Sequence, residues 1–140
     1  MTEAGEILAA EAARFASLGW MRGTSGNLSL VVNRDPLRLA VTASGKDKGE
    51  LGPTDVVVVD TAGRAVAETA SRPSAEAALH ARIAAMTRAG AVVHVHTVAA
   101  VVAGRRWPHG VVLSDLEMLK GIGAPPAGQR VTVRTRGWAG

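Results

Sequence analysis

Two histidines placed two residues apart are the residues of this chain best suited to chemistry. His94 and His96 lie in the valine-rich run Gly90–Thr97, which predicts a buried strand. Alternate residues of a strand project from one face, so both imidazoles are expected side by side. Imidazole nitrogen suits a zinc-class ion, which in a catalytic site usually takes about three protein ligands and keeps one position open. The pair therefore predicts two thirds of a Zn²⁺ site.

The third ligand of such a site is not evident in the sequence. The chain has no cysteine, so only histidine and carboxylate remain as donors. Glu76 and Glu117 are the carboxylate candidates, although a residue used as a ligand is poorly placed to act as a free base. His109 is an outside candidate, because the turn Trp107–Gly110 is more simply an exposed loop. His80 is expected to be structural, since an isolated histidine on an alanine-rich helix is more typical of the interior.

Two loops carry small and hydroxyl side chains of the kind that bind anions. Residues 24–27 combine hydroxyls, an amide and backbone N–H groups around a glycine, and residues 44–46 place serine, glycine and lysine at a strand end. Glycine, serine and asparagine are also ordinary turn residues, so a plain hairpin turn remains the alternative for the first loop. By themselves the loops indicate a possible cradle for an anionic group.

Hydrophobic periodicity predicts the elements that hold these residues in place. Apolar side chains repeat at helical spacing from Thr2 to Gly19, which indicates an amphipathic first helix. The β-prone runs that follow predict a hairpin and a further strand that is buried on both faces at residues 56–60. Strands are expected over residues 37–44, 56–60, 90–97 and 130–133, in the β-prone run that ends at Val32, and as a short edge strand over 64–67.

A second helix is expected over residues 75–88, with Ser74 as its cap. Glu76 and His80 are four residues apart and would share a helical face, where the ring could pair with the carboxylate or simply pack.

A short third helix is expected over residues 115–121, capped by Ser114. Glu117 falls in its first turn, where the helix dipole favours an acidic residue whatever its function.

The composition restricts the class of protein. A length of 140 residues predicts one domain over residues 1–140. Lys and Arg outnumber Asp and Glu by 16 to 12, and a net charge of +4 without tyrosine suits small anionic substrates better than nucleic acid. The absence of cysteine is compatible with a reducing cytosol, and no signal peptide or membrane span is evident. The chain is expected to be soluble and cytoplasmic.

Five short motifs occur together in a fixed order from about Ile7 to Gly123. They are Gly23–Ser29, Val41–Lys46, Pro73–Glu76 with Leu79-His80, His94–Thr97 and Glu117–Gly121. In this order and spacing the chain resembles the class II aldolase/adducin superfamily, most closely its methylthioribulose-1-phosphate dehydratase branch. The resemblance implies an α/β fold, a three-layer α/β/α sandwich with a mixed, largely antiparallel central sheet, which assembles as a homotetramer.

The resemblance also implies roles for individual residues. His94 and His96 match two zinc ligands, Glu76 matches the acid/base residue of the aldolases, and Glu117 matches that of the dehydratases. Because the motif around Glu117 belongs to the dehydratase branch, we favour Glu117. The sugar phosphate would be held by Ser25, Gly26, Asn27, Ser44 and Gly45.

The implied reaction is dehydration of a sugar phosphate, namely methylthioribulose 1-phosphate in methionine salvage. Zinc acts as a Lewis acid that stabilises an enediolate, and a carboxylate moves the proton. The same enediolate could serve carbon–carbon cleavage, which is the reaction of a class II sugar-phosphate aldolase of the fuculose-phosphate type. A non-catalytic adducin-like interaction domain is the alternative from another class.

The chain departs from the family pattern at its C-terminal end. Relatives of this kind place a third zinc-binding histidine after the helix that carries Glu117, whereas this chain has no histidine beyond His109. The expectation is therefore a C-terminally shortened domain with an incomplete site, or a fragment that does not fold stably by itself.

Overall fold

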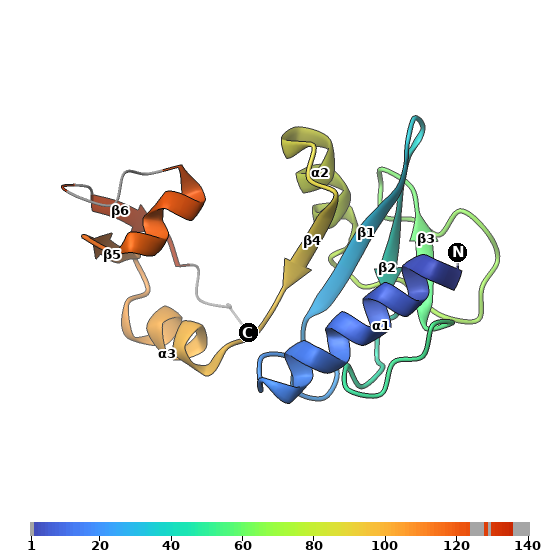
Figure 1. The fold of residues 1–140 in the computed structure, drawn as a ribbon, viewed down its shortest axis with the longest axis horizontal. Helices are drawn as coiled ribbons and strands as arrows, with labels where there is room; N and C mark the ends of the chain where they lie inside the picture. Colours follow the sequence, from blue (N-terminus) through green and yellow to red (C-terminus); the bar gives the residue numbers. More distant parts are fainter. Residues whose placement is uncertain (1, 124–127, 129, 136–140) are drawn as a thin grey trace. The chain divides into compact units, whose positions relative to one another are not determined.

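The helices and strands of this computed structural model follow the hydrophobic pattern over most of the chain, and the model describes residues 2–123, 128 and 130–135 (Figure 1). Two compact units are present, Met1–Thr97 and Val98–Gly140. The single domain over residues 1–140 stays a prediction.

The elements divide between the two units. The first unit contains α1 Thr2–Ser17, β1 Asn27–Arg34, β2 Leu37–Thr42, β3 Val56–Val59, α2 Ala77–Thr87 and β4 Ala91–His94. The second contains α3 Val98–Arg106, β5 Val111–Ser114, the 3₁₀ helix η1 Glu117–Ile122 and β6 Arg130–Val133.

The first unit is built around a four-stranded sheet in the order β3-β2-β1-β4. All of its pairings are antiparallel, and β1 and β2 form the predicted hairpin. The register places Asn27 of β1 opposite His94 of β4. The start of β1 and the end of β4 therefore meet at one end of the sheet.

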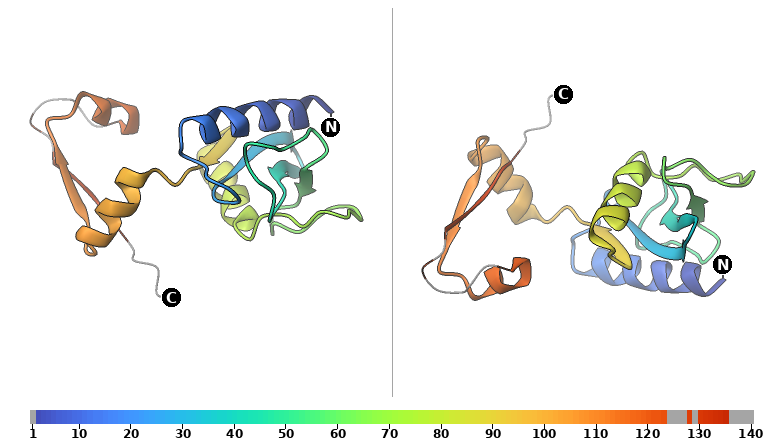
Figure 2. Two further views of the ribbon diagram at one scale, coloured as in Figure 1. Left: turned by 90° about the horizontal axis from the view of Figure 1, so that it is seen from below. Right: turned by 90° about the horizontal axis from the view of Figure 1, so that it is seen from above.

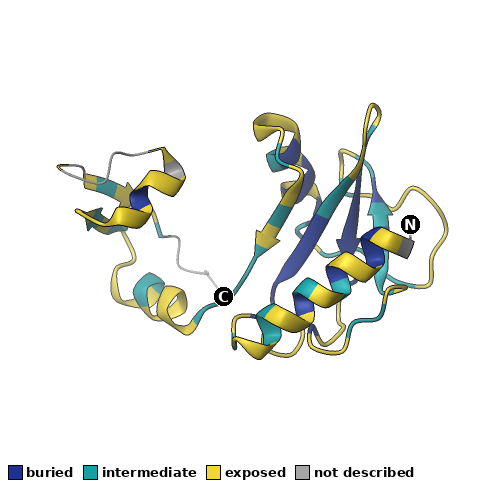
Figure 3. Ribbon diagram, viewed as in Figure 1, coloured by how far each residue is buried: buried dark blue, intermediate teal, exposed yellow. Residues whose placement is uncertain are grey.

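One helix covers each face of this sheet (Figures 1 and 2). Alternate residues of β2 divide between the faces: Leu39 and Val41 pack with the alanines of α2, whereas Ala40 packs with Leu8 and Ala12 of α1. This alternation builds two cores, one under each helix, which Figure 3 shows as buried stretches along β1 and β2. The predicted α/β/α layering and antiparallel pairing are confirmed.

Both outer strands are less buried than the sequence predicts. In β4, Val93 is 49% exposed, and the strand ends at His94 instead of continuing to Thr97. In β3, buried and half-buried valines alternate, although burial on both faces is expected. Among the described residues each of these strands has one neighbour in the sheet order, so part of its surface lacks cover. The short edge strand expected over 64–67 is reduced to a bridge between Val59 and Ala65.

The second helix begins later than predicted. Residue Ala77 is the first of α2, and Glu76 occupies the N-cap with φ −94° and ψ 6°. The hydroxyl of Ser74 accepts the N–H of Glu76 at 3.2 Å, so it caps a turn before the helix rather than the helix itself. Glu76 thus stands at a junction between loop and helix.

The C-terminal end of α2 is held by an arginine from the sheet. Arg34, the last residue of β1, donates hydrogen bonds to the carbonyls of Arg88 and Ala89, both at 2.8 Å, and a longer one to Ala84 at 3.4 Å. The last carbonyls of a helix lack partners within it, so a guanidinium with five donors suits them. This contact fastens the helix to the sheet hairpin.

The second unit has much less interior. Strands β5 and β6 pair as an antiparallel ladder, which confirms the predicted strand at 130–133, and α3 contains no buried residue. The predicted helix over 115–121 is a 3₁₀ helix, and Leu116 is its N-cap in place of Ser114. The reason is local: Asp115 has φ 54°, a left-handed conformation that a helix starting at Ser114 would not allow. No helix among the described residues is long and apolar enough to cross a membrane.

Candidate active site

The two histidines lie together at the end of β4. Their ring centroids are 4.6 Å apart with the planes tilted by 41°, as expected for residues i and i+2. His94 is the last residue of the strand, and the N–H of His96, just beyond it, donates to the carbonyl of Trp20 at 2.7 Å. This bond continues the course of the strand past its formal end and fixes the backbone that carries both rings.

A carboxylate holds one ring of the pair. The Oε2 atom of Glu76 accepts hydrogen bonds from Nδ1 of His94 at 2.6 Å and from Nδ2 of Asn27 at 2.5 Å. These three residues, the Glu76 cluster, come from the N-cap of α2, the start of β1 and the end of β4. An ionised carboxylate can only accept hydrogen bonds, so Nδ1 of His94 carries the proton that it donates to Glu76. The lone pair of Nε2 is then available to a ligand.

The charge on Glu76 is favoured by this arrangement. Burial raises the pKa of the Glu76 carboxyl group, but hydrogen bonds from Asn27 and His94, together with the electrostatic effect of the nearby His94 and His80 rings, outweigh it. The resulting pKa of Glu76 lies below its ordinary value, so the carboxylate is ionised at neutral pH. Its side chain is 31% exposed, which leaves it accessible.

The side chain of Asn27 belongs to the Glu76 cluster and is not exposed to solvent. It is buried, its Nδ2 serves Glu76, and its Oδ1 has no hydrogen-bond partner among the described residues. A buried carbonyl oxygen without a partner is costly and often marks a functional site. Its expected contact with a phosphate stays a prediction.

Gly26 permits the close approach of the loop to β4. It has φ 78°, and a Cβ at this position would lie 2.7 Å from the carbonyl oxygen of His94 and 2.7 Å from Cε of Met21. Any other residue would clash with the backbone that carries the histidine, besides being strained at this φ. The loop and the histidine strand are therefore in contact because residue 26 has no side chain.

The remaining expected phosphate residues lie on two loops. Ser25 is half-buried, whereas Ser44 and Gly45 are exposed; Ser44 donates its N–H to the carbonyl of Arg72 at 2.9 Å, and Gly45 has φ 73° with open space around it. Their assignment to a phosphate remains a prediction.

A buried lysine connects these loops, and the sequence reasoning missed it. Lys48 is 2% exposed, and its ammonium donates to the carbonyls of Thr24 at 3.0 Å and Lys46 at 2.8 Å. Desolvation by burial lowers the pKa of Lys48, although the charge of Asp47 opposes this. Nothing in the run Lys46-Asp47-Lys48 distinguishes the buried lysine from the exposed one, so no local signal could have found it.

His80 has the interior position expected of a structural residue. It is 1% exposed, and its Nδ1 lies 2.8 Å from the hydroxyl of Ser29 rather than against Glu76. Desolvation lowers the pKa of His80, with Glu76 raising it and His94 lowering it further. The ring is therefore neutral at pH 7.

Glu117 belongs to the second unit and is described within that unit. Its side chain is 80% exposed, and its Oε1 forms an ion pair with Nζ of Lys120 at 2.5 Å. His109, the outside candidate for a third ligand, is exposed in the turn before β5. The structure thus brings together Glu76, Asn27, His94 and His96, all from the first unit.

The donors fit part of a metal site. A carboxylate bound to Nδ1 of His94 is the usual support for a metal-binding imidazole, because it fixes the ring and its tautomer. His96 supplies a second imidazole beside it. Among the described residues, however, no group of three or more His, Cys, Asp or Glu side chains could hold a metal ion. Two histidine donors are what this part of the chain offers.

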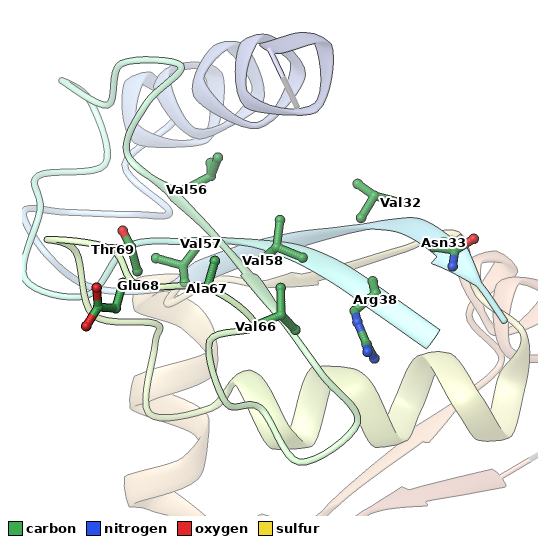
Figure 4. Close-up of a pocket in the computed structure, with 10 residues that line it drawn as sticks. All are labelled: Val32, Asn33, Arg38, Val56, Val57, Val58, Val66, Ala67, Glu68 and Thr69. Atoms are coloured by element: carbon green, nitrogen blue, oxygen red, sulfur yellow. The ribbon is translucent and has the colours of Figure 1, made fainter. Parts of the chain in front are cut away.

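A cavity lies elsewhere on the first unit. It is an open groove of about 640 Å³ along β3, with valines on its floor and Arg38 and Glu68 at its margins (Figure 4). None of the Glu76 cluster lines it. An open groove of this kind, remote from the histidines, does not supply the candidate site with a substrate pocket.

Comparison with known proteins decides the family. The model of the class II aldolase and adducin N-terminal domain matches residues 6–129. The chain belongs to this family. The resemblance inferred from the ordered motifs is confirmed, and the family assignment covers both the Glu76 cluster and the stretch that contains Glu117.

Two relatives are named methylthioribulose-1-phosphate dehydratase. The protein of Geobacillus kaustophilus (strain HTA426) is 52% identical over 91 residues, which cover 65% of this chain and 43% of the relative. The protein of Bacillus cereus (strain B4264) is 44% identical over 103 residues, covering 74% of this chain and 49% of the relative. The chain thus matches about half the length of these relatives.

Solved structures agree on the fold. An L-fuculose 1-phosphate aldolase has a TM-score of 0.63 and 31% identity, over 74% of this chain and 49% of its own. The L-fuculose-1-phosphate aldolase from Thermus thermophilus has a TM-score of 0.64 at 23% identity, over 85% of this chain and 58% of its own, and so supports the fold alone. The predicted class II aldolase fold is confirmed.

Proposed function

We propose that this chain serves the zinc-dependent dehydration of methylthioribulose 1-phosphate, a reaction of methionine salvage. The observation that carries the proposal is its 52% and 44% identity to two proteins named for that dehydratase. The geometry is compatible with it, because an ionised Glu76 and two adjacent imidazoles form a polar cluster at the end of the sheet. Cytoplasmic location and assembly as a homotetramer belong to the same proposal.

In this proposal His94 and His96 would hold the Zn²⁺. The bound metal would supply Lewis acidity, withdrawing electrons from the ketone and its neighbouring hydroxyl. Glu76 would act beside it as the residue that orients His94, since its carboxylate already receives the Nδ1 proton. Asn27 would fix that carboxylate in turn through its 2.5 Å hydrogen bond.

The proton transfers are assigned to Glu117. Its carboxylate would take the proton from the carbon next to the ketone, leaving an enediolate. The same group, now protonated, would return the proton to the departing hydroxyl, so that water leaves and the carboxylate is regenerated. The family motif around Glu117 supports this role. The phosphate would lie against Ser25, Gly26, Asn27, Ser44 and Gly45.

The test is turnover of methylthioribulose 1-phosphate by the purified chain with and without added Zn²⁺. The expected product is the dehydrated diketone phosphate, formed only with metal, and His94→Ala should lose both zinc binding and turnover. Stoichiometric zinc without dehydration would contradict the proposal and favour aldolase-like chemistry. No zinc binding at all would also contradict it and favour a non-catalytic adducin-like interaction domain.

Aldol cleavage is the second candidate. It is favoured by the 31% identity to an L-fuculose 1-phosphate aldolase and by the position of Glu76 against His94, since Glu76 matches the acid/base residue of the aldolases. The two reactions differ in their products. Release of a three-carbon phosphate and an aldehyde from fuculose 1-phosphate, with no dehydration, would assign the chain to the aldolases.

A further inference from the structure

Lys48 is the one charged residue among the largest fully buried side chains of the described chain. Lysine is rarely buried completely, because moving an ammonium out of water costs several kcal/mol unless it finds partners. The contacts of Lys48 should therefore indicate the role of this buried charge.

The contacts of Lys48 join two loops that are distant in sequence. Its ammonium donates to the carbonyl of Thr24 in the first loop and to that of Lys46 in its own. Its backbone N–H donates to the carbonyl of Gly23 at 2.8 Å, so a second bond links the two loops. The buried Lys48 therefore holds residues 23–26 against residues 44–49 by hydrogen bonds.

The charge of Lys48 is not neutralised by contact with a carboxylate. Its ammonium bonds to carbonyl oxygens, and no ion pair of Lys48 is found in the described part of the chain. Asp47 influences it through space, while its side chain accepts the N–H of Gly49. Lys46 differs, since it is exposed and pairs with Asp55 at 3.3 Å. A buried, unneutralised cation between two loops raises the potential felt by an anion on them.

We propose that Lys48 is a positioning residue for phosphate: its buried ammonium holds loops 23–26 and 44–49 in the arrangement that receives the phosphate of the substrate. The inference rests on the proposed function, which assigns a sugar phosphate to these loops. Each loop contributes a serine and a positive-φ glycine, namely Ser25 with Gly26 and Ser44 with Gly45. Lys48 itself does not touch the ligand.

The first experiment compares Lys48→Met with Lys46→Met, which removes an equal charge from the exposed side of the same loop. The probe is inorganic phosphate, measured by calorimetric titration. Lys48→Met should weaken phosphate binding at least tenfold, and Lys46→Met less than threefold. For turnover, Lys48→Met should raise KM for the phosphorylated sugar while leaving kcat and the affinity for the unphosphorylated sugar unchanged.

Chemical rescue distinguishes positioning by the ammonium from packing by the side chain. The chain contains no cysteine, so Lys48→Cys introduces a unique thiol. Alkylating it with 2-bromoethylamine in the unfolded state, then refolding, restores an ammonium at nearly the length of lysine. Phosphate affinity should return with this adduct and stay low with an uncharged thioether of similar size.

The outcomes separate the two proposals. If the unaltered chain neither binds phosphate nor prefers the phosphorylated sugar, the proposed function fails. If the unaltered chain does both and Lys48→Met keeps that preference, only the role of Lys48 is overturned. Should the variants not fold, hydrogen exchange in the unaltered chain decides: phosphate should slow the amides of both loops together, and slowing in one loop alone contradicts the proposal.

Discussion

The two units of this chain differ in how firmly they hold their polar residues. In Met1–Thr97, two cores pack against the sheet and fix Glu76 between Asn27 and His94. In the described part of Val98–Gly140, Leu119 is the one buried residue, and Glu117 is exposed beside Lys120 (Figure 3). The difference teaches that a site residue is positioned by the core beneath it, and that Glu76 has such support within its unit whereas Glu117 has little.

The sharpest way to test this contrast is to neutralise each carboxylate in turn. Glu117→Gln should lower kcat by about 10²–10⁴-fold, because it removes the proposed proton carrier. Glu76→Gln should instead raise the Kd for zinc by about 10–100-fold, because it removes the support of His94. Steady-state kinetics and zinc titration measure the two effects. A Glu117→Gln chain with unchanged kcat would transfer the acid/base role to Glu76.

Stability should divide between the units in the same way. Leu39→Ala empties a fully buried position under α2 and should lower the free energy of unfolding by about 2–5 kcal/mol. Val101→Ala on α3, where the valine is 48% exposed, should change it by less than about 0.5 kcal/mol. Urea unfolding monitored by circular dichroism measures both. Comparable losses would show that α3 is packed as firmly as the sheet.

One arginine adds hydrogen bonds to the packing that attaches the C-terminal end of α2 to the sheet. Arg34→Met should cost about 1–2 kcal/mol, since up to three hydrogen bonds from a charged donor to helix carbonyls are lost. Arg82→Met provides the control, because it removes the same charge from an exposed position on that helix. Thermal unfolding of the two variants should separate them; equal midpoints would mean that solvent replaces the guanidinium without loss.

The smallest effect is a dependence of stability on pH. The pKa of His80 in the folded chain lies below 6.5, its ordinary value, so on acidification the unfolded chain binds the proton first. Stability should therefore fall as the pH drops below about 6.5, by at most about 1.4 kcal/mol per pH unit for one proton. His80→Gln should flatten the curve in that range. Loss from Glu76 begins lower, as the pH falls from about 4.5 through its depressed pKa.

Much of the first unit could be predicted because its signals are local. The apolar repeat of α1, the hairpin of β1 and β2, and the proximity of His94 to His96 follow from helical and strand spacing alone. The sequence does not reveal the start of α2, because Pro73 and Ser74 are typical of a helix start and yet form a separate turn before Glu76.

Other features depend on contacts between distant residues. Asn27 and Glu76 are 49 positions apart, so no local pattern could reveal that the amide holds the carboxylate. The burial of Lys48 contradicts the usual preference of lysine for water and is explained only by two carbonyls that the fold brings to it. The departure at η1 comes from the left-handed backbone conformation of Asp115, which aspartate tolerates but does not require, so the sequence alone does not fix it.

Gly26 has a consequence for how the site would appear in a survey of all single substitutions. It offers no functional group, yet every replacement would push against the carbonyl oxygen of His94 at 2.7 Å and adopt an unfavourable φ. Under selection for activity, position 26 should be as intolerant as His94 itself. Measuring protein abundance alongside activity would distinguish the two positions. Substitutions at Gly26 should disturb the packing of a loop, whereas substitutions at His94 should remove a ligand.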